Sequence, residues 1–106
     1  MKTSKLFFIL TAIISAIFVN AQPLQTISGK VSDTNQQPLA FANVILFSDS
    51  TFIDGTITDD YGNFKIENSQ TKANCLNISL LGYKSVNIAI PEDGNIGIIE
   101  LYNPTK

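Results

Sequence analysis

From residue 22 to the end of the chain, short stretches of alternating apolar and polar residues are separated by clusters of Gly, Pro, Asn, Asp and Ser, at intervals of roughly ten residues. No part of this region carries the 3.6-residue apolar period of an amphipathic helix over a useful length. Alternation with a period of two places one face of each stretch on a core and the other in solvent. The pattern predicts an all-β protein, built as a sandwich of two sheets packed face to face.

Seven strands are predicted, in an antiparallel or mixed arrangement. In the first of them, Ile27, Gly29 and Val31 share one face. The second is a nearly continuous apolar run, which is typical of a strand buried on both faces or close to it. The predicted strands cover residues 26–32, 41–47, 52–58, 63–67, 75–80, 86–90 and 96–101.

The best-specified turn is predicted at residues 59–62, between the third and fourth strands. Asp59 suits the first position of a type I turn, because its carboxylate can bond the backbone amides that follow. Gly62 can adopt the positive φ that lets the return strand resume through a bulge. Phe64 and Ile66 are then expected to point toward the core.

Three further glycines and a proline carry information about the backbone. Gly29 and Gly55 lie inside predicted strands, where glycine usually marks a bulge or the close approach of another backbone. Gly82 marks a bend, and Pro38 ends the ladder of the first strand because it has no N–H group to donate. No helix is predicted after any of these glycines, so they do not form a phosphate-binding loop.

The first 21 residues differ in character from the rest of the chain. Two lysines, at positions 2 and 5, precede an uncharged run over residues 6–19, and the residues up to Ala21 suit signal peptidase. The pattern predicts a cleavable signal peptide over residues 1–21 and a mature domain over residues 22–106. The alternative is a membrane anchor, but the run is shorter than the roughly 20 residues that span a bilayer. We therefore expect no transmembrane span after cleavage.

The sequence contains no His and no Arg, and its single Cys cannot form an intramolecular disulfide. Proteases of the usual kinds need an imidazole base or a His-ligated zinc ion, and bidentate recognition of phosphate needs a guanidinium. We therefore expect a non-enzymatic protein without a cofactor. Cleavage after residue 21 leaves five Lys against nine Asp and Glu, a net charge of −4. Such an acidic chain is a poor partner for nucleic acid or an anionic membrane surface.

Four aspartates lie close together in the sequence, an arrangement compatible with a calcium site: Asp49, Asp54, Asp59 and Asp60. Calcium takes six to eight oxygen ligands from converging loops, and this spacing matches no calcium-loop motif. Turn formation explains Asp49, Asp59 and Asp60 without a metal. We favour the turn interpretation.

Five aromatic side chains are candidates for an exposed sugar-binding platform: Phe41, Phe52, Tyr61, Tyr83 and Tyr102. The alternative is that they pack within the protein. Phe41 and Phe52 border predicted core strands, and Tyr61 lies at the tip of a predicted hairpin. Packing in the core or in turns is therefore the favoured interpretation.

Cys75 stands at the start of a predicted strand, on the face opposite Leu76 if the alternation holds. A partly exposed, unpaired thiol in an oxidising compartment can cross-link two chains. A structural thiol, tucked under the preceding loop, is favoured over such a bridge.

Three blocks of the sequence resemble the carboxypeptidase-regulatory-like domain family. The first is Ile-Ser-Gly-Lys-Val-Ser-Asp at residues 27–33 with Gln-Pro-Leu-Ala-Phe-Ala-Asn-Val at 37–44. The second is Gly-Thr-Ile-Thr-Asp-Asp-Tyr-Gly-Asn-Phe-Lys-Ile at 55–66, and the third is Leu-Asn-Ile-Ser-Leu-Leu-Gly-Tyr-Lys at 76–84. The resemblance implies a transthyretin-like, or Ig-like, β-sandwich. The residues that we assign to the family's structural motif are Gly29, Pro38, Gly55, Asp59, Gly62, Phe64, Gly82 and Tyr83.

In envelope proteins of Bacteroidota type, domains of this family often lie between the signal peptide and the plug of TonB-dependent outer-membrane receptors. The resemblance implies an exported, non-enzymatic structural or interaction module with envelope proteins as partners, in the periplasm, at the outer membrane or secreted. It would be a stand-alone or truncated form of such a protein. The alternative is a small carbohydrate-binding module. Zinc carboxypeptidases that carry this domain, and the related hydroxyisourate hydrolases, use His or Arg residues that this chain lacks.

Overall fold

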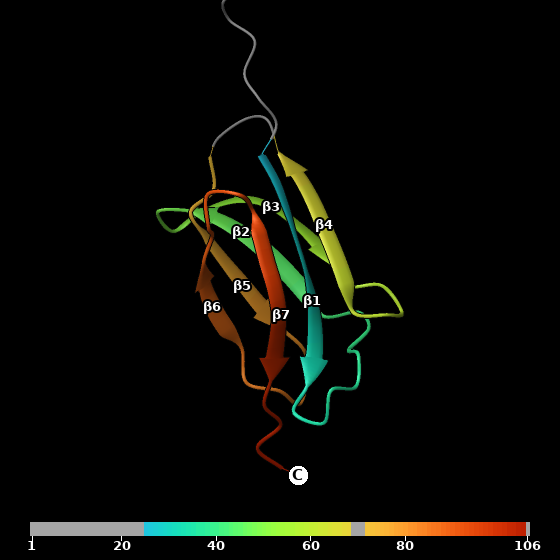
Figure 1. Cartoon of the computed structure of the whole chain (residues 1–106). Coiled ribbons are helices and arrows are strands. Elements are labelled where there is room, and N and C mark those ends of the chain that lie inside the picture. Colours follow the sequence, from blue (N-terminus) through green and yellow to red (C-terminus); the bar gives the residue numbers. More distant parts are fainter. Residues whose placement is uncertain (1–24, 69–71, 106) are drawn as a thin grey trace, which may run out of the picture.

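The computed structural model of the chain describes residues 25–68 and 72–105. Seven strands and no helix occur in these residues, as the sequence predicts (Figure 1). The expected signal peptide lies outside the described residues, and none of those described forms a helix able to cross a membrane. The strands are β1 (Gln25–Asp33), β2 (Asn43–Ser48), β3 (Thr51–Ile57), β4 (Asn63–Asn68), β5 (Cys75–Ser79), β6 (Val86–Ala89) and β7 (Asn95–Leu101).

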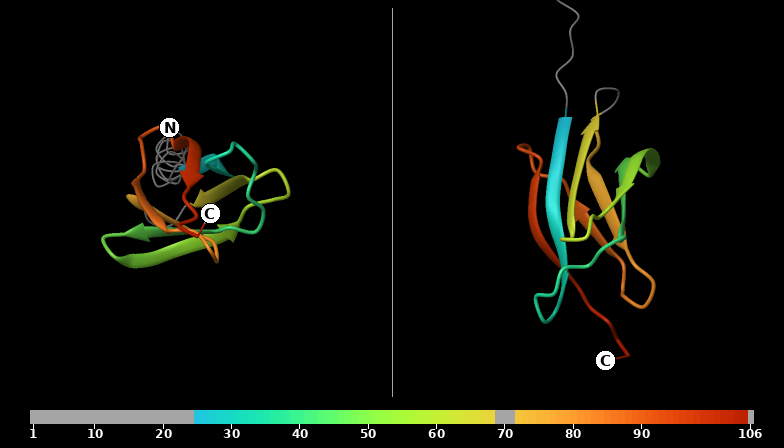
Figure 2. Two further views of the ribbon diagram at one scale, coloured as in Figure 1. Left: turned by 90° about the horizontal axis from the view of Figure 1, so that it is seen from below. Right: turned by 90° about the vertical axis from the view of Figure 1, so that its right-hand side faces the viewer.

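The strands form two sheets that lie face to face, so the predicted sandwich is confirmed (Figure 2). One sheet has the order β4-β1-β7, and the other has the order β3-β2-β5-β6. β1 and β7 run parallel, whereas the other neighbouring pairs are antiparallel. The chain passes between the sheets four times, in the connections β1–β2, β3–β4, β4–β5 and β6–β7. The predicted hairpin between the third and fourth strands is wrong, because β3 and β4 lie in different sheets and the turn between them joins the two layers.

The core lies between the sheets and is built from the inward-facing side chains of the alternating strands. Ile27 and Val31 of β1 are fully buried, and Phe64 and Ile66 of β4 point into the same space, as expected. The other core residues are Leu39, Ala42, Val44, Leu46, Ala73, Leu76, Ile78, Ile99 and Leu101. Because the single cysteine cannot form a disulfide cross-link within the domain, burial of these side chains supplies most of its stability.

The expectation that residues 41–47 form a strand buried on both faces or close to it holds only in part. β2 begins at Asn43, and Val44 and Leu46 are fully buried while the residues between and after them are only half-buried. A sandwich of two sheets has no third layer, so the outer face of each sheet meets solvent. Phe41 precedes the strand with a left-handed φ of 63°, and 63% of its surface is exposed.

Candidate functional site

Four segments gather at the end of the sandwich where β1 and β7 finish: residues 34–42, 58–62, 80–85 and 102–105. We call this region the loop end. The registers of the β1–β4 and β2–β5 pairs bring the segments to the same side, and Figure 1 shows the C-terminus there as well. The motif residues in these segments are Pro38, Asp59, Gly62, Gly82 and Tyr83.

Two turns of the loop end are built alike. Asp33 Oδ1 accepts hydrogen bonds from the backbone amides two and four residues further on, at 2.8 and 2.9 Å. Asp59 Oδ1 does the same, at 2.9 Å in both cases. The fourth residue of each turn is left-handed, with a φ of 66° at Gln36 and 79° at Gly62. The sequence predicts this geometry only for the second turn. A glycine at position 62 signals a positive φ, whereas the glutamine at position 36 does not.

We expect the substitution Gln36→Gly to stabilise the domain by about 0.5–1 kcal/mol. A non-glycine residue in the left-handed region costs roughly 1–2 kcal/mol, and glycine removes most of that cost at some expense in backbone entropy. The Gln36 side chain is exposed, so little packing is lost. Urea denaturation measures the change in the free energy of unfolding. Gln37→Gly, at a neighbouring position without a positive φ, is the control and should destabilise. A loss of stability in Gln36→Gly would contradict the prediction.

The turn between β3 and β4 packs directly on the end of β1. The Val31 amide donates a hydrogen bond to the carbonyl of Gly62 at 2.8 Å, and the Leu39 amide donates to the carbonyl of Val31 at 3.0 Å. A Cβ atom at Gly62 would collide with the Val31 carbonyl oxygen and would lie 3.4 Å from the Pro38 Cβ. Gly62 and Pro38 therefore meet at one junction, which holds the β1–β2 loop against the turn.

Thr58 belongs to the same junction, and sequence reasoning missed its importance. Its side chain is buried, its hydroxyl donates to the Leu39 carbonyl at 2.6 Å, and its Oγ1 accepts from the Ala42 amide at 2.9 Å. One hydroxyl thus satisfies two backbone groups of the β1–β2 loop, the Leu39 carbonyl and the Ala42 amide. The one signal in the sequence was a threonine directly before the acidic turn. Threonine is also a common strand residue, so its presence there did not indicate a special role.

The two glycines inside strands have different surroundings. Gly29 lies at a register irregularity between β1 and β7, and a Cβ there would be 2.8 Å from the Phe64 ring and 3.0 Å from the Gly97 carbonyl oxygen. Gly55, by contrast, is exposed, and the nearest atom to its Cβ would be the Val44 carbonyl oxygen at 3.4 Å. The expectation of a bulge or close approach at Gly55 is wrong, because the irregularity of the β2–β3 ladder falls earlier, opposite Phe47.

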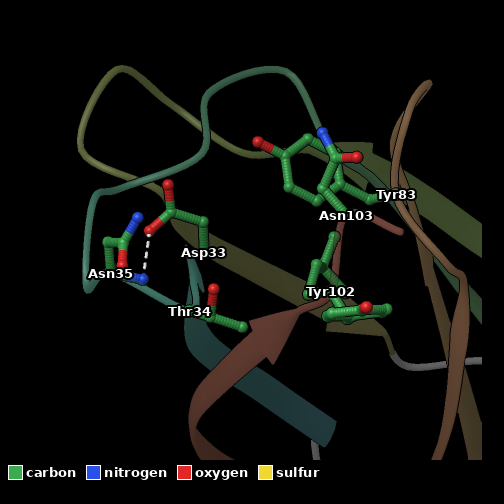
Figure 3. Close-up of a pocket in the computed structure, with 7 residues that line it drawn as sticks. Asp33, Thr34, Asn35, Tyr83, Tyr102 and Asn103 are labelled. Atoms are coloured by element: carbon green, nitrogen blue, oxygen red, sulfur yellow. Dashed lines mark hydrogen bonds between the residues drawn. The ribbon is translucent and has the colours of Figure 1, made fainter. Parts of the chain in front are cut away.

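The loop end contains a pocket of about 230 Å³ (Figure 3). Gly82, with a φ of 92°, turns the chain so that the Tyr83 amide donates to the Leu80 carbonyl at 3.0 Å. Tyr83 is half-buried and packs against the core, and the Lys84 amide donates to the Tyr102 carbonyl at 2.8 Å. These contacts place the residues after β7 beside the β5–β6 loop. The pocket is lined by Asp33, Thr34, Asn35, Tyr83, Leu101, Tyr102 and Asn103.

The expectation that the aromatic side chains pack in the core or in turns holds for Tyr83 and is wrong for Phe41, Phe52 and Tyr102, while Tyr61 lies in its predicted turn with its side chain exposed. Phe41, Phe52, Tyr61 and Tyr102 expose 63%, 61%, 71% and 53% of their surfaces. They lie in loops or on outer faces, where a two-layer sandwich provides nothing to cover them. Phe52 lies near the start of β3, remote from the loop end, so the five do not form one platform.

The acidic residues do not converge. Asp49 and Asp59 lie at opposite ends of the seven-residue strand β3, which spans about 20 Å. Asp49 Oδ1 accepts from the Asn74 side chain at 2.8 Å, Asp54 Oδ1 accepts from the Gly55 amide at 2.8 Å, and Asp59 holds its turn. Among the residues that the structure describes, no group of three or more acidic or thiol side chains could hold a metal ion. The Asp59 carboxylate accepts hydrogen bonds from backbone amides of its own turn, as the turn interpretation predicts.

Cys75, the first residue of β5, is half-buried and unpaired. It pairs with Phe47 on one side and with Ala89 on the other, and its thiol lies 3.9 Å from the Leu76 carbonyl oxygen. The thiol is therefore set within a sheet. This position agrees with the favoured structural thiol, and cross-linking of two chains through Cys75 stays an untested alternative.

Comparison with known proteins adds two findings. Residues 27–105 match the family model of the CarboxypepD_reg-like domain. The TonB-dependent receptor SusC of Bacteroides thetaiotaomicron is similar to this chain, with 31% identity over 99 residues, which is 90% of the chain. The matched region is 9% of the length of that receptor.

Proposed function

Because the chain belongs to the CarboxypepD_reg-like domain family, we propose that it is a non-enzymatic, exported module of the cell envelope that acts through its structure and its contacts with other proteins. The family match carries this proposal, since it spans nearly all of the described residues. The similarity to a TonB-dependent receptor supports an envelope setting and envelope proteins as partners.

The chemistry of the side chains supports a role without catalysis. The chain has no His and no Arg, and the hydrogen bonds of Asp33 and Asp59 serve turns rather than a reaction site. The buried Thr58 hydroxyl serves the backbone in the same way. We infer that the loop end, which gathers most of the motif residues, is the part of the domain used for recognition.

We propose that residues 1–21 are a signal peptide and that residues 22–106 are the mature domain, located in the periplasm or at the outer membrane. Mass spectrometry of the protein from the envelope fraction should give the mass of residues 22–106. The substitution Ile14→Lys places a charge in the apolar run and is expected to keep the full-length chain in the cytoplasm. Ile14→Leu, which keeps the run apolar, is the control. Envelope protein that retains residues 1–21 would contradict the proposal.

Carbohydrate binding is a second candidate function, favoured by the exposure of Phe41, Tyr61 and Tyr102 at the loop end. Affinity electrophoresis with soluble polysaccharides tests it. Retardation of the wild-type chain that disappears in Tyr61→Ala would support a sugar-binding module. Unchanged mobility in all gels would eliminate this candidate.

A further inference from the structure

The pocket at the loop end contains polar groups that the protein does not use. Asp33 Oδ1 holds its turn, whereas Oδ2 has no hydrogen bond or ion pair among the described residues. The side-chain amide of Asn35 and the hydroxyl of Tyr83 also have no partner there. Figure 3 shows Tyr83 across the pocket from the Asp33 turn, with its hydroxyl directed toward that turn. The groups are therefore available to a ligand.

The charge of the pocket favours a cation. Among the residues that the structure describes, Asp33 is the one charged side chain that lines the pocket, and none of the described lysines does so. The only ion pair among the described residues, Lys65–Glu67 at 3.3 Å, is in β4. A carboxylate without a countercharge attracts a positive group and repels an anion. The other lining side chains are neutral, so they do not offset it.

The aromatic and neutral residues of the pocket suit the same kind of ligand. Tyrosine rings attract ammonium groups through their electron-rich faces, and both Tyr83 and Tyr102 line the pocket. A primary ammonium has three N–H donors and no acceptor. The Asp33 carboxylate and the amide oxygen of Asn35 offer it acceptors. A volume of about 230 Å³ has room for one side chain and not for a folded segment.

From this combination we propose that the pocket binds the primary ammonium group of a lysine side chain presented by a partner protein. The inference rests on the proposed function, because it specifies the chemistry by which the interaction module recognises its partner. The aliphatic part of the lysine would lie along Tyr83 and the exposed Tyr102, and its ammonium group would reach Asp33 Oδ2.

A titration followed by nuclear magnetic resonance tests the proposal on the isotopically labelled chain. The probe is N-acetyl-lysine methylamide, and its neutral counterpart is N-acetyl-norleucine methylamide, which has a similar shape but no ammonium. We expect the lysine probe to shift the backbone resonances of residues 33–35, 83 and 102–103 to saturation. We expect the norleucine probe to bind at least about fivefold more weakly, because it cannot interact with the carboxylate.

Two aspartate variants form a matched pair. Asp33→Asn keeps the Oδ1 acceptor that holds the turn and removes the charge, so it should weaken lysine binding at least about fivefold. Asp59→Asn makes the same change in the twin turn, outside the pocket, and should leave affinity within about twofold. The amide spectrum of each variant reports whether it folds. Independently of any variant, salt raised to about 0.5 M should weaken lysine binding to the wild-type chain.

Several results would overturn the proposal. Lysine binding unaffected by Asp33→Asn would remove the role of the carboxylate, and equal binding of norleucine would identify a merely apolar pocket. Tetramethylammonium bound as tightly as lysine would refute recognition of a primary ammonium, and glucose bound equally by wild type and Asp33→Asn would indicate a sugar pocket. Absence of saturable shifts would refute the site itself. None of these results bears on export or envelope contacts, which are measured separately, so failure here is distinguishable from failure of the proposed function.

Discussion

Replacing Gly62 with alanine is expected to destabilise the domain by about 2–3 kcal/mol. Alanine in the left-handed region costs roughly 1–2 kcal/mol. In addition, the new Cβ would collide with the Val31 carbonyl oxygen, so the β3–β4 turn must move away from β1. That movement weakens the hydrogen bond between the Val31 amide and the Gly62 carbonyl, which contributes about 1 kcal/mol. Urea denaturation followed by circular dichroism measures the loss.

Gly97 provides a matched control for this prediction. Its φ of 80° is almost that of Gly62, but a Cβ there would have no atom within 4 Å. Gly97→Ala should therefore cost only the roughly 1–2 kcal/mol of the backbone conformation. The difference between the two variants isolates the close approach of the turn to β1. Equal losses in both variants would show that this packing contributes nothing measurable.

The substitution Thr58→Val is expected to cost about 2–4 kcal/mol. Valine has nearly the shape of threonine but cannot satisfy the Ala42 amide and the Leu39 carbonyl, which both depend on the Thr58 hydroxyl. A buried backbone group left without a partner costs about 1–3 kcal/mol. Thermal and urea denaturation give the change in stability.

Thr58→Ser tests whether the hydroxyl is the cause. Serine keeps both hydrogen bonds and loses one buried methyl group, a cost of about 1 kcal/mol. The prediction is therefore that serine is tolerated much better than valine. The opposite order would mean that the methyl group in the core matters more than the hydrogen bonds to the β1–β2 loop. In that case Thr58 would have no special part in holding the loop end.

The loop end joins these results to the proposed function. Gly62, Pro38 and Thr58 fix the β1–β2 loop against the sandwich, and that loop begins with the Asp33 turn that lines the pocket. A recognition site on loops needs such fixed points, because binding groups that move must be ordered when the ligand arrives. The structural motif of the family and the candidate binding site thus share one end of the molecule.

The number and type of the strands could be predicted from the sequence because alternation and turn residues act locally. Asp59 and Gly62 together indicate a tight turn, and the structure has that turn between β3 and β4 (Figure 1). The two strands do not pair as a hairpin, because they lie in different sheets. The family resemblance found in the motif blocks was likewise visible without a structure. Local patterns of this kind can be read from the sequence because the alternation within a strand and the residues of a turn depend little on the rest of the fold.

The features that escaped prediction depend on neighbours distant in the sequence. The exposure of Phe41 and Phe52 follows from the absence of a third layer, which no local pattern records. The pocket combines Asp33 with Tyr83, residues that are far apart in the chain and meet only through the arrangement of the two sheets. The left-handed conformation of Gln36 was hidden for a simpler reason, since glutamine gives no sign of it.

Cross-linking mass spectrometry on intact cells tests most directly whether this domain is an envelope interaction module. Lys30, Lys65, Lys72 and Lys84 of the mature domain offer amines to a lysine-reactive reagent. We predict cross-links from the mature domain to outer-membrane or periplasmic proteins, with those of Lys84, which lies in the loop end, prominent among them. Cross-links confined to cytoplasmic proteins, on a chain that retains residues 1–21, would contradict the proposed function.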